Sequence, residues 1–419
     1  MRGGTRFRRL RRAAVALGTL GAVGAVAVGG TGLALYRTAD AGLTRIPVSA
    51  LEGKDGGQAL NVLVVGSDSR DGLTREEELA LKLGSFEGQR SDTVILASIT
   101  PDQQGVSLVS FPRDLLVLDD DGDPHKLTET FFEGPDHVVD IVASNFGIPV
   151  HHYAEISILG FLGVVETLGA VEICLDESLR DRKSGADFEA GCHAMDPEEA
   201  LSYVRSRQGA RGDFERIERQ QVFLKAMLSE MVSSRTLTDV PKLFRVVERV
   251  ADNVTTDDGL DPATMRTLAE ELRGLASGDV PMVVVPGYTR TIGGKSYVVA
   301  YRPGAEALFA SIRDGEVLAP RGSKEERLET SVAIWTGGRA DGTDVVASTL
   351  NYSGFSAASA GPGEVDAGAT TRVYVVPGFE DQAGWVGATL GAPVQSLPVG
   401  IEPPEGAQVV VAVGDDATS

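Results

Sequence analysis

An uncharged run near the N-terminus constrains this chain more than any other feature. Residues 13–36 form a stretch of 24 residues without a charged side chain, and six arginines precede it within residues 1–12. A helix of that length rises about 36 Å, enough to cross the hydrocarbon core of a bilayer. The positive-inside rule then places residues 1–12 in the cytoplasm and the rest of the chain outside. We therefore expect a single-pass membrane protein with an extracellular body.

A cleaved signal peptide is the alternative interpretation of this run. Ala39-Asp40-Ala41 is compatible with a cleavage site, but the apolar region of a signal peptide spans only about 7–15 residues. The uncleaved anchor is favoured, and both interpretations export residues 37–419. The only two cysteines of the chain, Cys174 and Cys192, fit that compartment, because nearby cysteines form disulfides in an oxidising environment. We predict a disulfide between them.

Composition excludes several classes of protein. A chain of 419 residues with 42% hydrophobic residues suits two or three folded domains. Five histidines and two cysteines exclude zinc ribbons and multi-histidine metal centres. The net charge of −21 argues against a nucleic-acid partner. Asp119–Gly122 is similar to part of a calcium loop, but Val117 and Thr128 occupy its first and last ligand positions, so a solvated turn is expected.

Strand-like and helix-like segments alternate along the chain and predict an α/β fold. Strands are expected at residues 60–65, 93–99, 106–111, 282–285 and 296–301. Helices are expected at residues 137–146, 158–168, 197–203, 214–232, 240–252 and 262–275. A smaller α/β domain is expected to have strands at 332–335, 372–376 and 408–413. The predicted organisation is a juxtamembrane linker at 37–59, a main domain at 60–315, a polar linker at 316–329 and a second domain at 330–416.

Polar residues gather where three predicted strands begin or end. Asp68 follows the first strand, Arg90 and Asp92 open the second, and Arg113 follows the third. Substrate sites in α/β folds form at such strand ends and the loops beyond them. Each residue alone is typical of a surface charge, but three such loops together indicate a candidate site.

A cluster of arginines is the strongest local signal. Within fifteen residues of an otherwise acidic chain lie Arg205, Arg207, Arg211, Arg216 and Arg219. Arg205 and Arg207 alternate as in an extended segment, whereas Arg216 and Gln220 share one face of a helix. The alternative is a solvated basic patch paired with Asp213, Glu215 and Glu218. Guanidinium groups suit phosphate and nearby carboxylates suit Mg²⁺, so this set indicates a diphosphate ligand.

At these residues the chain resembles the LytR–CpsA–Psr family of cell-envelope phosphotransferases. The matching segments are Asn61–Arg70, Arg90–Thr100, Ser110–Asp114, Lys126-Leu127, Tyr203–Arg207 and Asp213–Gln221. Residues 330–415 are similar to the LytR C-terminal domain often found in actinobacteria, and the cysteine pair fits that group. Two departures are Thr128-Glu129, where family members commonly carry Asn, and Trp335–Gly338, where an Asn-Gly-Thr turn is usual.

The resemblance implies a fold, a reaction and a site. The implied fold is a central mixed sheet flanked by helices, with an apolar pocket for a polyprenyl chain. Residues 158–165 and 222–228 are candidates to line it. The implied reaction transfers a phospho-glycopolymer from polyprenyl diphosphate to peptidoglycan, at a muramic acid 6-hydroxyl, with Mg²⁺ as cofactor. Asp68 and Asp92 match metal or base positions, and Arg113 is expected to be catalytic. The diphosphate-binding residues are expected to be Arg90, Arg113, Lys126, Arg205, Arg207, Arg216, Arg219 and Gln220.

Two rival functions share the same ligand. A non-catalytic scaffold would bind polyprenyl phosphate without transferring anything, and a lipid diphosphatase would give the phosphate to water. Asp68, Asp92 and the arginines favour catalysis over binding alone. The residues leave open whether a hydroxyl or water is the acceptor, which glycan is carried and how many copies assemble.

Overall fold

The computed structural model describes residues 42–54, 57–68, 74–81, 91–102, 105–209, 213–231, 245, 248–249, 251–260, 264, 280–319, 321–337, 340–365 and 367–418. Among these residues, none of the helices has the length and hydropathy needed to cross a membrane. The predicted transmembrane segment 13–36 lies outside them, as do Arg90 and most of the predicted helices at 240–252 and 262–275.

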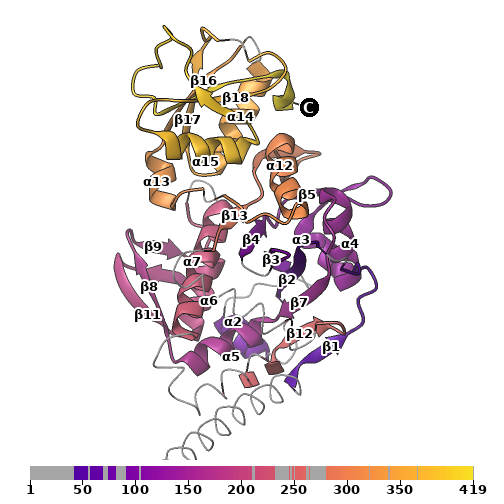
Figure 1. Cartoon of the computed structure of the whole chain (residues 1–419). Helices are drawn as coiled ribbons and strands as arrows, with labels where there is room; N and C mark the ends of the chain where they lie inside the picture. Colours follow the sequence, from indigo (N-terminus) through magenta and orange to yellow (C-terminus); the bar gives the residue numbers. More distant parts are fainter. Residues whose placement is uncertain are drawn as a thin grey trace, which may run out of the picture.

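A seven-stranded mixed sheet forms the centre of the larger domain (Figure 1). In spatial order its strands are β1 (Thr44–Ile46), β12 (Val254–Asp257), β7 (His152–Ile156), β2 (Leu60–Ser67), β3 (Ser91–Ile99), β4 (Val106–Phe111) and β13 (Met282–Val284). Strands β2, β3 and β4 pair antiparallel, whereas β7 runs parallel to β2 and β13 parallel to β4. The central strands are apolar on both faces because helices cover both sides.

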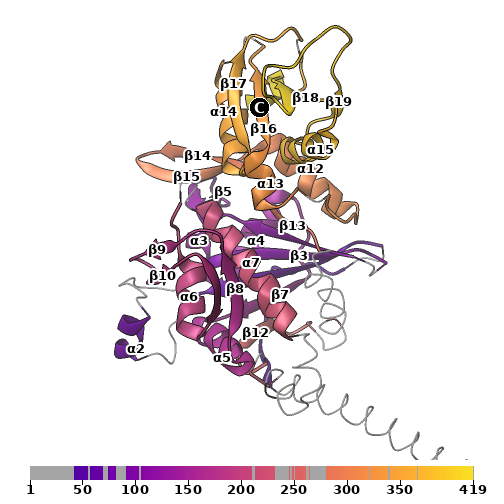
Figure 2. The same ribbon diagram turned by 90° about the vertical axis from the view of Figure 1, so that its left-hand side faces the viewer.

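Alternate side chains of the sheet enter two separate cores. Leu63 and Val65 of β2 pack with Phe111 on one face, together with α4 (Pro135–Phe146) and α12 (Arg302–Arg313). Val62 and Leu108 pack on the other face, where Leu224 of α7 (Asp213–Met231) contacts them. The helices of this domain are α2 (Arg75–Ala80), α3 (Leu127–Thr130), η1 (Phe131–Glu133), α4 (Pro135–Phe146), α5 (Ile158–Leu168), α6 (Pro197–Arg205), α7 (Asp213–Met231) and α12 (Arg302–Arg313). The second view shows α5, α6 and α7 gathered on one side of the sheet (Figure 2).

Local signals fix where these helices begin and end. Pro135 occupies the first turn of α4, and the helix ends at Gly147, whose φ of 60° is a left-handed conformation that glycine adopts without strain. Ser157 caps α5, since its hydroxyl accepts a hydrogen bond from the Gly160 amide. Asp196 caps α6 in the same way through the Glu199 amide.

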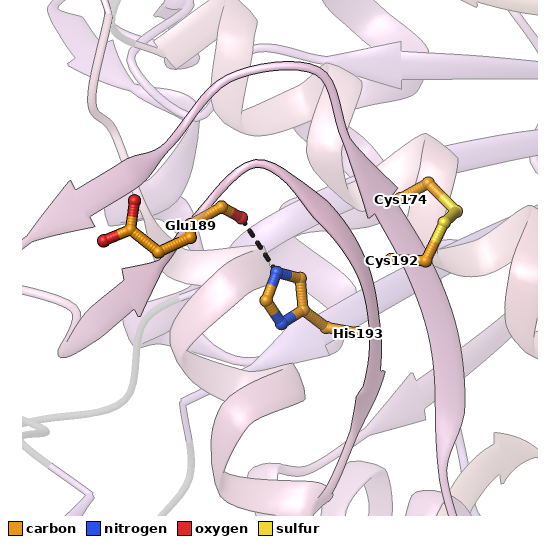
Figure 3. Close-up of a disulfide and its surroundings, with 4 residues drawn as sticks. All are labelled: Cys174, Glu189, Cys192 and His193. Atoms are coloured by element: carbon orange, nitrogen blue, oxygen red, sulfur yellow. Dashed lines mark hydrogen bonds between the residues drawn. A yellow bond between two sulfur atoms is a disulfide. The ribbon is translucent and has the colours of Figure 1, made fainter.

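A pair of hairpins inserted between α5 and α6 carries the disulfide. The strands are β8 (Val171–Leu175) with β11 (Gly191–Met195), and β9 (Leu179–Asp181) with β10 (Ala186–Phe188). Cys174 and Cys192 lie directly opposite each other in the β8–β11 pair and are bonded (Figure 3), which confirms the predicted disulfide. Beside it, Nε2 of His193 lies 2.8 Å from the Glu189 carbonyl oxygen.

Replacing both Cys174 and Cys192 with serine should lower the free energy of unfolding by about 3 kcal/mol, because a loop of this size is no longer closed in the unfolded chain. Urea denaturation of both proteins measures the difference. Alkylation before intact-mass measurement should find no free thiol in the exported parent protein. Equal midpoints, or two alkylated cysteines in the parent, would contradict the prediction.

The C-terminal residues form a separate five-stranded sheet. Its strands, in spatial order, are β17 (Ser356–Gly361), β16 (Ser331–Trp335), β20 (Val409–Ala412), β18 (Arg372–Val375) and β19 (Val394–Ser396). The helices here are α13 (Lys324–Glu329), α14 (Ala340–Tyr352), α15 (Glu380–Leu390) and η2 (Asp415–Thr418). Residues 316–329, expected to be a polar linker, contain α13. The larger domain supplies a side chain to this second core, because Tyr301 is buried among Val332, Val373 and Leu390.

His151, which directly precedes strand β7, is expected to make the fold sensitive to acid. His151 is 5% exposed, and its Nδ1 accepts a hydrogen bond from the Asn61 amide. Burial, reinforced by the charges of His152 and Lys54, lowers the pKa of His151 to about 4. In the unfolded chain the pKa of this residue is near 6.5. Its titration therefore leaves the free energy of unfolding unchanged above that pH. As the pH falls from 6.5 toward 4, the unfolded chain takes up a proton that the folded chain does not, and the free energy of unfolding decreases.

We expect this residue to account for about 3 kcal/mol of lost unfolding free energy between pH 7 and pH 4. Urea denaturation of the parent and of His151→Gln at both pH values tests this. The variant should lose less stability than the parent on acidification. Parallel losses in the two proteins would show that another group is responsible.

Candidate functional site

The strand order brings three predicted site residues to one edge of the main sheet. Because β2, β3 and β4 pair antiparallel, the end of β2, the start of β3 and the end of β4 meet there, with Gly66 opposite Thr93 and Val94 opposite Phe111. The half-buried Asp68 follows β2, and Arg113 follows β4 by two residues. Asp92 is the second residue of β3, so its backbone lies between those two ends.

Asp114 interacts with three basic side chains at this edge. Its Oδ1 lies 3.1 Å from Nζ of Lys126 and 3.5 Å from Nε of Arg113. Burial on its own would raise the pKa of Asp114, but the charges of Arg113, Lys126 and Arg207 outweigh it and hold the pKa below its usual value. The carboxylate is therefore ionised at neutral pH. The side chains of Arg113 and Lys126 are 18% and 21% exposed, so they are partly shielded yet reachable from solvent.

A short hairpin returns Lys126 to Arg113. Its strands are β5 (Leu116–Leu118) and β6 (Pro124–Lys126). The Thr128 amide donates a hydrogen bond to the Arg113 carbonyl at 2.9 Å, and the Leu127 amide donates to Leu115. Nζ of Lys126 also lies 5.8 Å from the ring centre of Tyr297. The β5–β6 hairpin, the Asp114 carboxylate and the Tyr297 ring therefore fix the position of this lysine.

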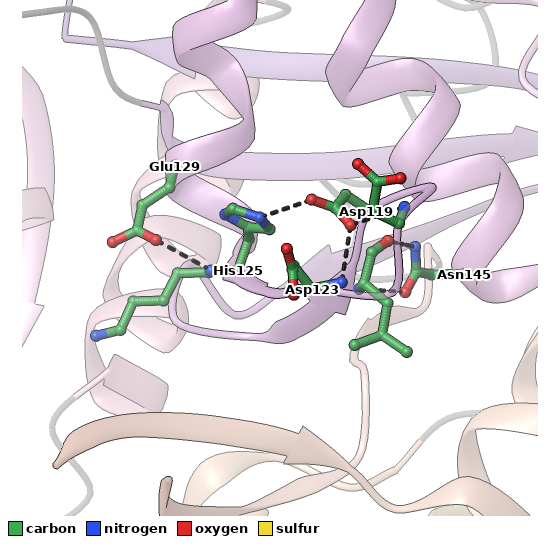
Figure 4. Close-up of polar contacts among 8 residues, drawn as sticks. Asp119, Asp123, His125, Glu129 and Asn145 are labelled. Atoms are coloured by element: carbon green, nitrogen blue, oxygen red, sulfur yellow. Dashed lines mark hydrogen bonds and ion pairs between the residues drawn. The ribbon is translucent and has the colours of Figure 1, made fainter. Parts of the chain in front are cut away.

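The turn between β5 and β6 contains Asp119. Its Oδ1 accepts hydrogen bonds from the amides of Asp121 and Asp123, while Oδ2 lies 2.9 Å from Nε2 of His125 (Figure 4). Oε2 of Glu129, which is also drawn in Figure 4, accepts a hydrogen bond from the Lys126 amide at 3.3 Å. In the described part of the chain, no group of three or more His, Cys, Asp or Glu side chains is arranged to hold a metal ion.

Asp181, on β9 of the disulfide-closed hairpin, organises the segment after α6. Its Oδ2 accepts hydrogen bonds from the Arg207 amide at 3.0 Å and from the Ser206 hydroxyl at 3.1 Å. Arg205 is the last residue of α6 and donates to the Leu81 carbonyl at 3.1 Å. The predicted extended alternation of Arg205 and Arg207 is therefore wrong, because α6 continues through Arg205.

Helix α7 carries the remaining candidates on its first turns. Arg216 is only 2% exposed, and Gln220 donates to the Val204 carbonyl at 3.5 Å. Arg219 donates to the Gln208 carbonyl, and burial lowers its pKa against the opposing charge of Glu215. Gln221 donates to the Ser110 hydroxyl at 3.1 Å, which places α7 beside the end of β4. Arg216 is buried and Arg219 is half-buried, which does not fit a freely solvated patch.

Two carboxylates that hold this site together were absent from the predicted set. Asp114 adjoins Arg113 in the sequence, so the Arg-Asp pair after a strand was the available signal. Asp181 lies more than twenty residues from the arginines it orders and has no local motif. In the described part of the chain, the predicted cations form two groups, one around Asp114 and one along the α6–α7 segment. Arg207 links the two groups, because it follows α6 and its charge acts on Asp114.

Apolar side chains adjoin the arginine segment. Ile158 and Leu201 are buried together, and the half-buried Leu81, Phe161, Leu162 and Val204 pack against them. Since Arg205 donates to the carbonyl of Leu81, a cation and an apolar surface lie next to each other here. Such a combination suits a ligand with a charged head and an apolar tail.

Comparison with known proteins identifies relatives. Residues 34–313 match the model of the LytR_cpsA_psr family. The cell wall biosynthesis protein LcpA of Corynebacterium glutamicum is 33% identical over 261 residues, which are 54% of this chain and half the length of LcpA. The polyisoprenyl-teichoic acid–peptidoglycan teichoic acid transferase TagU of Enterococcus faecalis is 30% identical over 57% of this chain and 74% of its own.

Solved structures agree with the sheet and its flanking helices. The LytR-Csp2A-Psr enzyme of Actinomyces oris is 22% identical and superposes with a TM-score of 0.52, covering 65% of this chain and 96% of its own. That likeness confirms the predicted fold of a central mixed sheet flanked by helices.

Proposed function

Since the chain belongs to the LytR_cpsA_psr family, we propose that it transfers a phospho-glycopolymer from a polyprenyl-diphosphate carrier to peptidoglycan. The observation that carries this proposal is the cation cluster around Asp114 at the catalytic edge, by which we mean the sheet edge with Asp68, Asp92 and Arg113. TagU, whose name describes transfer of teichoic acid from a polyisoprenyl carrier to peptidoglycan, supports the same class of reaction.

The reaction is a phosphoryl transfer with a hydroxyl acceptor. The acceptor oxygen forms a bond to the phosphorus that bears the glycan, and the bond from that phosphorus to the bridging oxygen breaks. Polyprenyl phosphate leaves, and the hydroxyl proton passes to a carboxylate, for which Asp68 and Asp92 are the candidates. Phosphoryl transfer depends mainly on positioning and on neutralising charge, which basic side chains supply.

The charge balance at the cluster suits a diphosphate. Arg113, Lys126 and Arg207 all act on the carboxylate of Asp114, so several positive charges are concentrated around one acid. The exposed Arg207 can turn to the ligand while Asp181 holds its backbone. Arg205, Arg216, Arg219 and Gln220 would bind the same head group from the α6–α7 segment, and Arg90 belongs to the proposed set by sequence.

Mg²⁺ is the proposed cofactor, held by Asp68 and Asp92. Consecutive antiparallel strands carry these two acids at one edge, and Mg²⁺ in phosphoryl-transfer sites is usually bound by one or two carboxylates together with substrate phosphates. When bound, the ion neutralises negative charge on the diphosphate. This donor set fits because oxygen ligands are what Mg²⁺ prefers.

The proposed function also requires a site for the polyprenyl chain and a membrane anchor. We propose that the polyprenyl chain lies against the apolar cluster of Ile158 and Leu201 beside Arg205, as the start of an apolar pocket.

Residues 13–36 would anchor the polypeptide in the membrane, with a cytoplasmic N-terminus. Strand β1 begins only eight residues after Tyr36, a reach of at most about 29 Å. Residues 330–416 would form the LytR C-terminal-like domain.

Reconstitution tests the proposal. The full chain in nanodiscs is incubated with a polyprenyl-diphosphate-linked saccharide, Mg²⁺ and a peptidoglycan oligomer, and polyprenyl monophosphate is measured. We expect release that depends on the peptidoglycan acceptor. Binding without release would favour the scaffold, and equal release without the acceptor would favour the diphosphatase.

A further inference from the structure

A buried ion pair joins helix α7 to α13, the helix that precedes the second sheet in the sequence. Nη2 of Arg327, on α13, donates to Oε1 of Glu218 at 2.5 Å, and the two side chains are 14% and 9% exposed. The other guanidinium nitrogens donate to the carbonyls of Ser353 at 2.9 Å and Gly322 at 2.7 Å. Arg327 therefore binds α7, the residue after α14 and the loop before α13 at once.

Aromatic packing holds the same face of α7. The guanidinium carbon of Arg327 lies 5.9 Å from the ring centre of Phe214, and the Tyr352 ring packs edge-on against Phe214 at 5.2 Å. Phe214 and Glu218 are four residues apart, so they share one helix face. That face contacts the C-terminal segment through Arg327 and Tyr352.

Two of the proposed diphosphate-binding residues lie on the opposite face of α7, and a third, Arg219, directly follows Glu218 in the helix. Arg216 and Gln220 stand two residues from Glu218 on either side, which turns them about 160° around the helix. Glu218 acts on the adjacent Arg219. Burial lowers the pKa of Arg219, and the charges of Glu215 and Glu218 act in the opposite direction. An uncompensated Glu218 would therefore attract the Arg219 guanidinium, which the ligand needs.

We propose that Arg327 is a positioning residue for the diphosphate site, through which the C-terminal domain fixes α7 and neutralises Glu218. With Arg327 in place, the carboxylate competes less with the diphosphate for Arg219. This inference rests on the proposed function only in naming diphosphate as the ligand.

A set of four full-chain variants tests it by calorimetric binding of geranylgeranyl diphosphate. Arg327→Met should weaken binding about tenfold or more, because it leaves Glu218 buried without its cation. Glu218→Gln removes the competing charge and should bind within about threefold of the parent. The double variant replaces both charges and should recover to the same range, since a buried pair exchanged for neutral groups is often tolerated. Arg302→Met, in the exposed pair with Glu306, is the matched control and should bind like the parent.

Hydrogen exchange of residues 213–221 provides a second readout that needs no ligand. Arg327→Met should raise exchange there and the double variant should restore it. A double variant as weak as Arg327→Met would mean that the pair serves folding alone and would overturn the inference, as would parent-like binding and exchange in Arg327→Met. A parent protein that binds no diphosphate would overturn the proposed function instead, and exchange alone would then decide whether Arg327 positions α7.

Discussion

Replacing Asp92 with alanine should lower the rate of glycan transfer by about a hundredfold or more while changing polyprenyl-diphosphate binding by less than about threefold. Asp92 lies at the start of β3, between the ends of β2 and β4. A metal ion held by Asp92, as proposed, would stabilise the reaction most when negative charge moves onto the departing polyprenyl phosphate, so turnover should suffer more than affinity. Single-turnover transfer and calorimetric binding of the same preparations separate the two effects.

The matched control is Asp187→Ala, because Asp187 is a largely exposed acid on β10 with only an exposed partner, Arg180. It should transfer at the parent rate. Parent-like transfer by Asp92→Ala at limiting Mg²⁺ would remove Asp92 from the catalytic set and leave Asp68 as the remaining acidic candidate.

Replacing Arg113 with alanine should weaken polyprenyl-diphosphate binding by about tenfold or more, since a charge-assisted hydrogen bond contributes about 1.5–3 kcal/mol. Arg113 is partly exposed beside Asp114, so its loss also leaves that carboxylate with less compensation. We expect transfer to fall along with binding, because the same cation stabilises the diphosphate before and during the reaction. Circular dichroism should confirm that the variant is folded.

The control for this variant must be an exposed arginine. Sequence alone suggests Arg321 in the linker, but the structure contradicts that choice: Arg321 is half-buried, and burial together with the charge of Arg327 lowers its pKa to about 10. Arg372→Ala, on the exposed side of β18, is the better control and should bind like the parent. Unchanged binding by Arg113→Ala would exclude Arg113 from the head-group site.

Apolar periodicity located most of the elements that build the main sheet. The predicted strand at 106–111 coincides with β4, and the predicted helix at 158–168 coincides with α5. Strand β7 was not predicted, because its residues 152–156 mix polar and apolar side chains at partly buried positions. Its place between β12 and β2 depends on long-range pairing, which no local pattern encodes.

Some residues of the candidate site could likewise be predicted from local sequence, whereas others are brought together only by long-range contacts. Arg113 and Asp68 could be chosen from sequence because they directly follow buried strands, and a strand end is a local feature. The contacts of Asp114 with Lys126 and of Asp181 with Arg207 span 12 and 26 residues, and only the folded chain brings these partners together. The ion pair between Glu218 and Arg327 spans 109 residues and joins two domains, so neither residue stands out within its own helix.

Transfer in water enriched in ¹⁸O distinguishes a peptidoglycan hydroxyl from water as the acceptor. The full chain is supplied with a polyprenyl-diphosphate-linked saccharide, Mg²⁺ and a peptidoglycan oligomer, and the products are analysed by mass spectrometry. We expect a peptidoglycan oligomer whose mass has increased by one phospho-saccharide, with no ¹⁸O in the new phosphodiester. Free saccharide phosphate carrying one ¹⁸O, with the oligomer unchanged, would contradict it.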